Sequence, residues 1–516
     1  MPEKALKRIN SYVLPQWKTC FFAGIIIGLI AHLYKITSWL PNWDSLVFRY
    51  DSQNMLGLGR WFLPVVCSFS SFYDLPFLNG LIAILFHALS AVLICKLLKV
   101  QKRTTAALIG GVIVSFPTVT SVMMYNYVAD GYSIAFFLST LAALLLTKEK
   151  PKYFLATLLI ALSAGIYQAY ITVTIMLVLL KLIDNIIYDK TEFVQILKKG
   201  AFMMLSGIAG MAVYAVILKL LLSFFSVEML DYQGLSSSVS LLNLDLWSSL
   251  YVVKETFMDC FFDISEGINV YVVLNLIVAA VTLAHYLRYI LRNEIYKKPI
   301  NILSLVVLSV LLVFGAGALA FLNPGIDYHN LMLMGYSVFY LFFIILYERG
   351  NDNSKIFLSI KSWVVLLITL LIIGNQVVIA NISYHKAQIA YEKSYGVLIR
   401  IADRIEQTPN AENCEKILVL GSLENSDNYS VNLTPDVTGV TDGYIIRADD
   451  ETVGQSVLAS ALADYCEKNY TFIQGEEKKA LAQKEEVKAM GVWPSQDSVS
   501  VLDDTVIIKL SAKGEN

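Results

Sequence analysis

Long apolar segments are the feature that most restricts what this chain can fold into. The 516 residues are 56% hydrophobic and only 16% charged, whereas soluble domains carry about 25% charged residues. A helix that crosses a bilayer needs roughly 20 predominantly apolar residues. Eleven segments approach that length, and we expect membrane-spanning helices at residues 19–38, 76–97, 104–123, 131–147, 153–167, 169–188, 200–225, 269–291, 300–321, 331–347 and 357–380. The sequence therefore predicts a polytopic α-helical membrane protein.

The distribution of Lys and Arg predicts the orientation of these spans, because short cytoplasmic loops collect positive charge. With the N-terminus inside, the segments assigned to the cytoplasm hold 22 Lys and Arg residues, and the opposite loops hold four, which are Lys35, Arg49, Arg60 and Lys254. We therefore expect a multi-pass protein of the plasma (inner) membrane with a cytoplasmic N-terminus that is retained and not cleaved as a signal peptide. An odd number of spans would leave the C-terminal region outside.

Residues 384–516 differ in composition from the rest and predict a second domain after a membrane domain at 1–383. This part is rich in Glu, Lys, Asp and Asn. Residues 387–407 have helical apolar spacing, and "KILVLG", "GYIIRA" and "TVIIKL" are typical of short buried strands, with helices expected at 451–467 and 476–489. We expect a small extracytoplasmic α/β domain, in which Cys414 and Cys466 are either paired or two free thiols.

Charge and cysteine usage restrict the partners and cofactors. The net charge of −2 argues against a nucleic-acid partner. The six cysteines lie without CxxC or Cys/His ligand spacing, so no metal site is indicated, and no cofactor is expected. A divalent metal stays compatible with the sequence without being indicated by it.

Charged residues gather in the first outer loop, "PNWDSLVFRYDSQNMLGLGRWF" at 41–62. If its beginning is helical, Asp44 and Asp51 lie on one face. Gly57 and Gly59 then permit a sharp turn that presents Arg60. The other outer segments are 125–132, 323–330 and the long stretch 226–268, which mixes apolar and polar positions at helical spacing and predicts an amphipathic helix in the membrane interface.

One chemistry suits carboxylates and guanidinium groups in a loop at the membrane surface, namely glycosyl transfer from a lipid-phosphate-linked sugar to a hydroxyl. The hydroxyl becomes a nucleophile when a carboxylate accepts its proton. The departing lipid phosphate needs a cation to stabilise its charge, and the guanidinium of Arg is well shaped to bind phosphate through two hydrogen bonds. A single Asp with Arg is therefore sufficient.

Several stretches resemble the O-antigen-type (type II) glucosyltransferase family, within the GT-C class of membrane glycosyltransferases. They are "WDSLVFR", "GRWFLPV", "YNYVADGYSIAFFLSTLAALLL", "SAGIYQAYITV" and "VWPSQDSVSVLDDTVIIKLS". The resemblance implies an inverting enzyme with a polyprenyl-phosphate sugar donor, usually of glucose, and a surface or lipid-linked glycan as acceptor. It also implies, as partners beside the lipid bilayer, a small membrane flippase and an enzyme that synthesises the donor.

The resemblance implies roles for particular residues. Its acidic motif falls on Asp44, with Ser45 where relatives often have a second Asp, which favours Asp44 as the base and makes a metal bridged by two carboxylates less expected. Its "GR" falls on Gly59 and Arg60, and Asp130 stands where GT-C enzymes often place another acid. In the late loop His329 stands where an Arg was expected to hold phosphate.

The complete set of candidate site residues has three parts. The catalytic candidates are Asp44, Asp51 and Asp130; the donor-phosphate candidates are Arg49, Arg60, Lys219 and His329; the acceptor candidates are Tyr127, Tyr167, Gln168 and Tyr170. Lys219 has an alternative role, since a Lys near the end of a span commonly extends to the lipid headgroups.

Two other functions remain open from the sequence. A flippase or transporter of lipid-linked saccharide would predict charges buried within the spans of matched halves, and few such charges are present. A polymerase of surface glycan is poorly separated from a transferase by sequence alone.

Overall fold

A computed structural model gives the architecture, and it describes residues 3–4, 12–49, 53–189, 191–230, 245–264, 267–326, 328–349, 355–423 and 454–512. The chain divides into two compact units. Of the described residues, those within 3–37 and 53–381 belong to unit 1, and those within 38–49, 382–423 and 454–512 belong to unit 2. The segment 38–49 of the first loop therefore groups with the C-terminal part of the chain.

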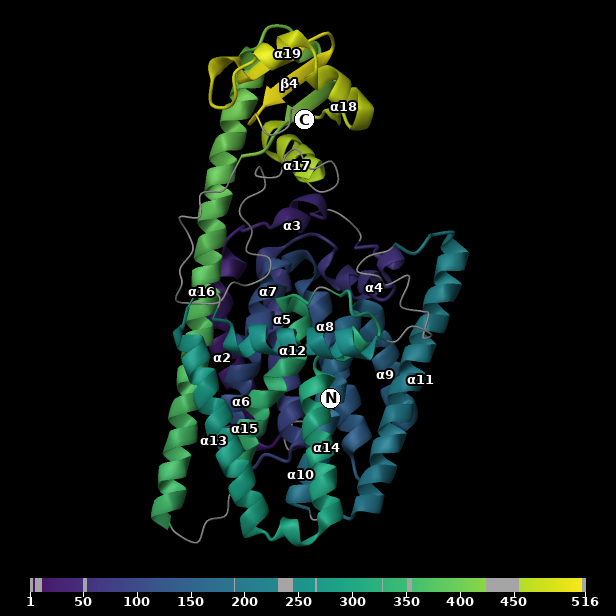
Figure 1. Ribbon diagram of the computed structural model, residues 1–516, viewed down its shortest axis with the longest axis vertical. Coiled ribbons are helices and arrows are strands. Elements are labelled where there is room, and N and C mark those ends of the chain that lie inside the picture. The colour runs from purple at the N-terminus through teal and green to yellow at the C-terminus, as the bar shows by residue number, and fades with distance from the viewer. Residues whose placement is uncertain are drawn as a thin grey trace. The chain divides into compact units, whose positions relative to one another are not determined.

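Unit 1 is built from helices (Figure 1). Its α-helices are α2 (Pro15–Thr37), α4 (Leu63–Cys67), α5 (Pro76–Leu97), α6 (Arg103–Ser115), α7 (Pro117–Met124), α8 (Ala129–Thr147), α9 (Tyr153–Ile166), α10 (Ile171–Ile187), α11 (Phe193–Phe225), α12 (Leu246–Phe262), α13 (Val270–Arg292), α14 (Pro299–Gly315), α15 (Val338–Glu348) and the first part of α16 (Lys355–Gln407). Short 3-10 helices lie between them: η1 (Leu56–Leu58), η2 (Ser68–Ser70), η3 (Asn126–Val128), η4 (Gln168–Tyr170), η6 (Ile295–Lys297), η7 (Ala318–Phe321) and η8 (Asn330–Ser337).

Each of the eleven predicted spans contains helix. Within the described residues, eight helices are long and apolar enough to cross a membrane, and the bent pair α6 and α7 would make nine. The remaining two predicted spans fall on the shorter apolar helices α9 and α14. The structure thus confirms a mostly helical protein of the membrane type, whereas the number eleven stays a prediction.

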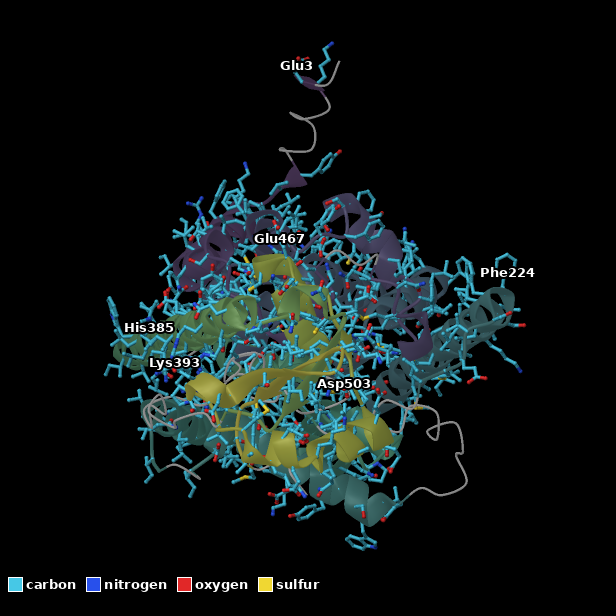
Figure 2. All side chains as sticks on the ribbon, turned by 90° about the horizontal axis from the view of Figure 1, so that it is seen from above. Glu3, Phe224, His385, Lys393, Glu467 and Asp503 are labelled. Atoms are coloured by element: carbon cyan, nitrogen blue, oxygen red, sulfur yellow. The ribbon has the colours of Figure 1, made fainter. Side chains whose placement is uncertain are left out.

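Several of these helices expose apolar side chains, as lipid contact requires. In an apolar 18-residue stretch of α11, only 17% of the residues are buried. Phe224, near its end, is 80% exposed and projects away from the neighbouring helices of unit 1 in Figure 2. Such a face would be an aggregation liability in water and is ordinary in a bilayer.

The break between α6 and α7 contributes residues to the lining of a cavity in unit 1. The two helices meet at 42°, and Phe116 between them has an extended ψ of 138°. The cause is Pro117, because a proline disfavours helical geometry in the residue before it. The break brings a corner at residues 116–118, of which Phe116 is non-helical, into the interior of unit 1.

Unit 2 contains a four-stranded sheet in the order β2-β1-β4-β3. The strands are β1 (Lys416–Leu420), β2 (Thr471–Phe472), β3 (Val499–Leu502) and β4 (Thr505–Lys509). Strand β1 is parallel to both β2 and β4, and β3 is antiparallel to β4. Strands β1 and β4 lie where "KILVLG" and "TVIIKL" predicted them, and "GYIIRA" lies outside the described residues.

Helices cover both faces of this sheet. Successive side chains of a strand point to opposite sides, and strand β1 places apolar side chains on both sides, so both faces are buried. Ile417 and Val419 of β1 join a core with the later part of α16 and with α17 (Gly454–Cys466). Leu418 and Leu420 join a second core beneath α18 (Gly475–Ala482) and α19 (Glu485–Ala489). The two helices α18 and α19 replace the one helix predicted at 476–489. Cys414 and Cys466 are free thiols.

Leu46 also belongs to the first of these cores, although it lies in the first loop. It is 2% exposed and is carried by α3 (Trp43–Val47), a helix that starts where the Asn42 side chain accepts a hydrogen bond from the Ser45 backbone N–H at 2.8 Å. Asn is a favoured residue at this position. Unit 2 therefore has a core to which residues more than 350 positions apart contribute.

Candidate functional site

Arg60 lies against two tyrosines, in the part of the first loop that belongs to unit 1. Its Nη1 donates a hydrogen bond to the Tyr132 hydroxyl at 2.9 Å, and its guanidinium carbon lies 5.0 Å from the ring centre of Tyr167. The Tyr132 and Tyr167 rings are themselves stacked, with their centres 4.5 Å apart. Guanidinium groups bind well to aromatic faces, so this pair of rings fixes the direction of Arg60.

The predicted turn at Gly59 makes this geometry possible. Gly59 has a φ of +77°, and a side chain there would collide with the Tyr214 hydroxyl and the Gln168 amide. Gln168 in turn donates to the Leu58 carbonyl at 2.9 Å and to Tyr214 at 3.0 Å. The structure thus brings together three residues predicted from sequence, namely Arg60, Tyr167 and Gln168, whereas Gly57 lies within η1.

Asp130 opens α8 in a buried position. It is 1% exposed and accepts hydrogen bonds from the Ser70 hydroxyl at 2.6 Å, from the Gly131 backbone N–H at 2.9 Å and from the Cys67 thiol at 3.8 Å. These bonds tie η2 to the start of α8. In this arrangement the carboxylate acts as an acceptor for neighbouring protein groups.

Asp44 and Arg49 belong to unit 2. Asp44 lies in the first turn of α3 and is half-buried. The Arg49 guanidinium forms an ion pair with Asp464 of α17 at 3.0 Å and lies 4.6 Å from the ring centre of Trp39. The prediction that Asp44 and Asp51 share a helical face required a helix that continues beyond Asp44. The helix α3 ends at Val47, and Phe48 already has non-helical backbone angles. Asp51 itself lies outside the described residues.

The remaining predicted residues are dispersed over unit 1. Lys219 is exposed on α11, and His329 is half-buried before η8. Tyr127 is 3% and Tyr170 is 1% exposed, and the Tyr170 ring lies 5.8 Å from that of Tyr167, edge to face. Tyr170 is therefore packed beside the group formed by Arg60, Tyr132 and Tyr167, which we refer to as the Arg60 cluster.

A cavity of about 350 Å³ that the sequence did not predict lies elsewhere in unit 1. It is lined by the corner Phe116, Pro117 and Thr118, by Tyr251, Val252, Glu255, Thr256, Asp259, Cys260 and Asp263 from α12 and its end, and by Tyr271, Ile326, Tyr328, Asn330 and Leu333. We refer to it as the α12 cavity. The residues predicted as site residues from the sequence are not among those that line it.

An acidic stripe on α12, defined as Glu255, Asp259 and Asp263, forms one wall of the α12 cavity. Glu255 and Asp259 are four positions apart, so they lie on one side of α12, and Asp263 follows as the first residue after the helix. Glu255 is paired with the exposed Lys254 at 2.9 Å. Burial, together with the charges of Asp263 and Glu255, raises the pKa of Asp259. This spacing was visible in the predicted amphipathic segment and would have identified the stripe.

Hydrogen bonds hold the other walls in place. The Tyr271 hydroxyl donates to the Cys260 carbonyl at 2.9 Å. The Tyr328 hydroxyl donates to the Gly317 carbonyl and accepts from the Ala320 N–H, both at 2.9 Å. Because these hydroxyl groups are occupied by backbone partners, both rings have fixed orientations. Ser249 further holds α12 to η7 through the Ala320 carbonyl at 2.8 Å.

The chain was compared with known proteins. Residues 33–346, more than half of the chain, match the family model described as Glucosyl transferase GtrII. The chain belongs to the GtrII glucosyl transferase family. This confirms the resemblance seen in the sequence and makes the protein a glucosyltransferase. No curated protein and no solved structure gave a match.

The GtrII match spans both features of unit 1. It begins near the end of α2 and ends in α15, so it contains the Arg60 cluster and the α12 cavity. The motif "VWPSQDSVSVLDDTVIIKLS" lies beyond it. Within the described residues, no group of three or more His, Cys, Asp and Glu side chains is arranged to hold a metal ion.

Proposed function

We propose that this GtrII family member transfers glucose from a polyprenyl-phosphate donor to a hydroxyl of a surface or lipid-linked glycan. The reaction takes place on the extracytoplasmic face and inverts the configuration at the anomeric carbon. The observation that carries the proposal is the family match over residues 33–346, in a chain whose helices are of the membrane type. A donor with a lipid tail is the form of activated sugar that an enzyme embedded in the bilayer meets directly.

The chemistry requires a base for the acceptor. A hydroxyl oxygen attacks the anomeric carbon, the bond from that carbon to the phosphate oxygen breaks, and the hydroxyl proton passes to a carboxylate. We assign this carboxylate to Asp44, because it falls in the acidic motif of the first loop and is half-buried with access to solvent. General bases of this kind contribute about 10²- to 10⁴-fold in rate.

The leaving polyprenyl phosphate requires a cation, and we assign this role to Arg60. Its guanidinium uses one nitrogen on Tyr132 and one face on Tyr167. An arginine oriented in advance stabilises developing negative charge without reorganising during the reaction. Arg49 is paired with Asp464, so any contact of Arg49 with phosphate would have to compete with that carboxylate.

Mass spectrometry of the surface glycan in cells with and without the gene tests the proposal. We expect a hexose branch to be missing in cells without the gene. An unchanged glycan that is accompanied by accumulation of lipid-linked sugar on the cytoplasmic side would instead indicate a flippase. Shortened glycan chains with unchanged branches would indicate a polymerase. Either of these two results contradicts the proposed transferase.

A further inference from the structure

The α12 cavity has the wrong charge for the phosphate of the donor. Its described lining residues include the three carboxylates of the acidic stripe and no Lys, Arg or His. A carboxylate is an acceptor of hydrogen bonds and repels a phosphate. A ligand of this cavity therefore has to be neutral or cationic and to present hydrogen-bond donors.

A buried hydroxyl at the cavity has no partner within the described part of the protein. Thr118 is 1% exposed and lines the cavity. Among the described residues, no group forms a hydrogen bond with its Oγ1 atom. Burying a hydroxyl without a partner is unfavourable, so this group is satisfied when a ligand with a polar group occupies the cavity.

Aromatic rings and size narrow the class of ligand further. The Tyr328 and Tyr271 rings are fixed by their hydrogen bonds, and Phe116 and Tyr251 add apolar surface. A lining that combines aromatic rings with hydrogen-bond acceptors suits a ring that has apolar faces and hydroxyl groups at its edge. The volume of about 350 Å³ lies at the lower end of the roughly 300–1,000 Å³ that is typical of ligand sites, which fits one sugar unit better than a chain of several.

We infer that the α12 cavity is a binding site for a neutral hexosyl unit, with Asp259 and Thr118 forming hydrogen bonds to its hydroxyl groups. The inference rests on the proposed function, because a glucosyltransferase handles two such units. One is the glucose of the donor and the other is the sugar of the acceptor that receives it.

Photo-crosslinking of the full chain in lipid nanodiscs tests the site without depending on catalysis. One arm uses polyprenyl-phosphate glucose with a diazirine on the sugar, and the other uses a methyl glucoside with the same group. Labelled peptides are identified by mass spectrometry. We expect either probe to label peptides that contain residues 116–118 or 251–263. Unmodified polyprenyl-phosphate glucose is then added as a competitor. If it suppresses the labelling, the cavity binds the sugar of the donor. If the glucoside still labels the cavity in its presence, the cavity binds the sugar of the acceptor.

Matched variants determine whether the named residues form the site. Asp259→Asn should reduce labelling at a subsaturating probe concentration about tenfold, because it removes the charge and replaces one acceptor oxygen with a donor amide. Thr118→Val should reduce labelling roughly three- to tenfold, because it removes the hydroxyl group. Thr120→Val is the control for the second change, since Thr120 is buried in the same helix and does not line the cavity. Asp189→Asn, at an exposed position, is the control for the first. If Asp259→Asn does not fold, the comparison of labelling between Thr118→Val and Thr120→Val tests the inference.

The outcomes separate this inference from the proposed function. Labelling outside the cavity, or equal labelling of Thr118→Val and Thr120→Val, overturns the inference even if the protein transfers glucose. Labelling in the cavity that the two variants reduce supports the inference even if the protein fails to transfer glucose from the lipid donor.

Discussion

Arg49 and Asp464 form an ion pair, with Nη1 3.0 Å from Oδ2, although 415 residues separate them in the sequence. The pair joins the first loop to α17 within unit 2. Trp39 adds a hydrogen bond from its indole N–H to the Tyr465 hydroxyl at 2.9 Å. The segment that carries Asp44 is thus part of the folded C-terminal unit, and changes in that unit should affect the loop.

The first prediction concerns Leu46, because its burial and not the ion pair should dominate the stability of this attachment. Arg49 and Asp464 are partly exposed, with side-chain exposures of 26% and 21%, and such pairs contribute about 0–1 kcal/mol. Leu46→Ala creates a cavity in the core and should lower the free energy of unfolding of unit 2 by about 2–5 kcal/mol. Pulse proteolysis of the full chain in urea measures this change.

Val47→Ala is the matched control for Leu46→Ala. Val47 is in the same helix but is 37% exposed, so its substitution should change the free energy of unfolding by no more than about 0.5 kcal/mol. Equal effects of the two variants would show that α3 is not part of the core of unit 2.

The second prediction concerns Arg60→Lys. Lysine keeps the positive charge but lacks the planar fork that both stacks on Tyr167 and donates to Tyr132. We expect transfer to fall by about 10²- to 10³-fold, as when one preorganised donor at a developing charge is lost. Initial rates with a labelled lipid-linked donor measure it.

Arg103→Lys provides the comparison for Arg60→Lys, because Arg103 is exposed at the start of α6 and its substitution should leave the rate unchanged. A rate for Arg60→Lys equal to that of Arg103→Lys would remove Arg60 from the reaction.

The sequence predicted well what depends on neighbouring residues. Apolar segments such as 76–97 gave the helices, since hydrophobicity over about 20 residues is a local property. Gly59 gave the turn before Arg60, because a φ of +77° favours glycine. Strands β1 and β4 were likewise predicted, because their short apolar runs are typical of buried strands.

What the sequence did not reveal depends on contacts between distant segments. Nothing near Arg49 indicates Asp464 as its partner, and nothing near Leu46 indicates a core shared with α17. The α12 cavity combines the corner at Pro117, the helix α12 and the loop at Tyr328, which only the fold brings together. The i, i+4, i+8 spacing of the acidic stripe was the one local signal.

The third prediction concerns the pH dependence of sugar binding. The pKa of Asp259 is raised, first by burial and then by Asp263 and Glu255. Its carboxylate accepts hydrogen bonds at both oxygens only when it is deprotonated. The KM for the sugar bound in the α12 cavity should therefore rise as the pH falls through this raised pKa, which lies above the value of about 3.9 for an ordinary aspartate.

Acidification, which weakens sugar binding through Asp259, should raise the free energy of unfolding through the same residue. The folded state holds this proton more tightly than the unfolded state, so protonation of Asp259 favours folding, and its contribution is lost as the pH rises through the raised pKa. Burial raises the pKa of Cys260 and of Tyr328, which also line the cavity, so both groups stay protonated over the acidic range. The carboxyl groups of Glu255 and Asp263 line the same cavity. In Asp259→Asn the rise in KM should weaken; an unchanged pH profile would contradict the role of Asp259.

The fourth prediction concerns Asp44→Asn. Asparagine preserves size but accepts a proton poorly, so transfer should fall by about 10²- to 10⁴-fold while the protein remains folded. Asp51→Asn and Asp130→Asn should each lower the rate of transfer by a smaller factor. Asp403→Asn, at an exposed position of α16, controls for the substitution itself. Near-normal transfer by Asp44→Asn together with an inactive Asp130→Asn would move the base to Asp130.

The central claim is that the sugar comes from a lipid phosphate, and the most direct test offers the purified full chain two donors. The protein is held in nanodiscs, and either radiolabelled polyprenyl-phosphate glucose or radiolabelled UDP-glucose is supplied to it, with the surface glycan as acceptor. We predict transfer from the lipid-linked donor alone, with one polyprenyl phosphate released for each glucose transferred. Transfer from UDP-glucose without any lipid-linked donor would contradict the account.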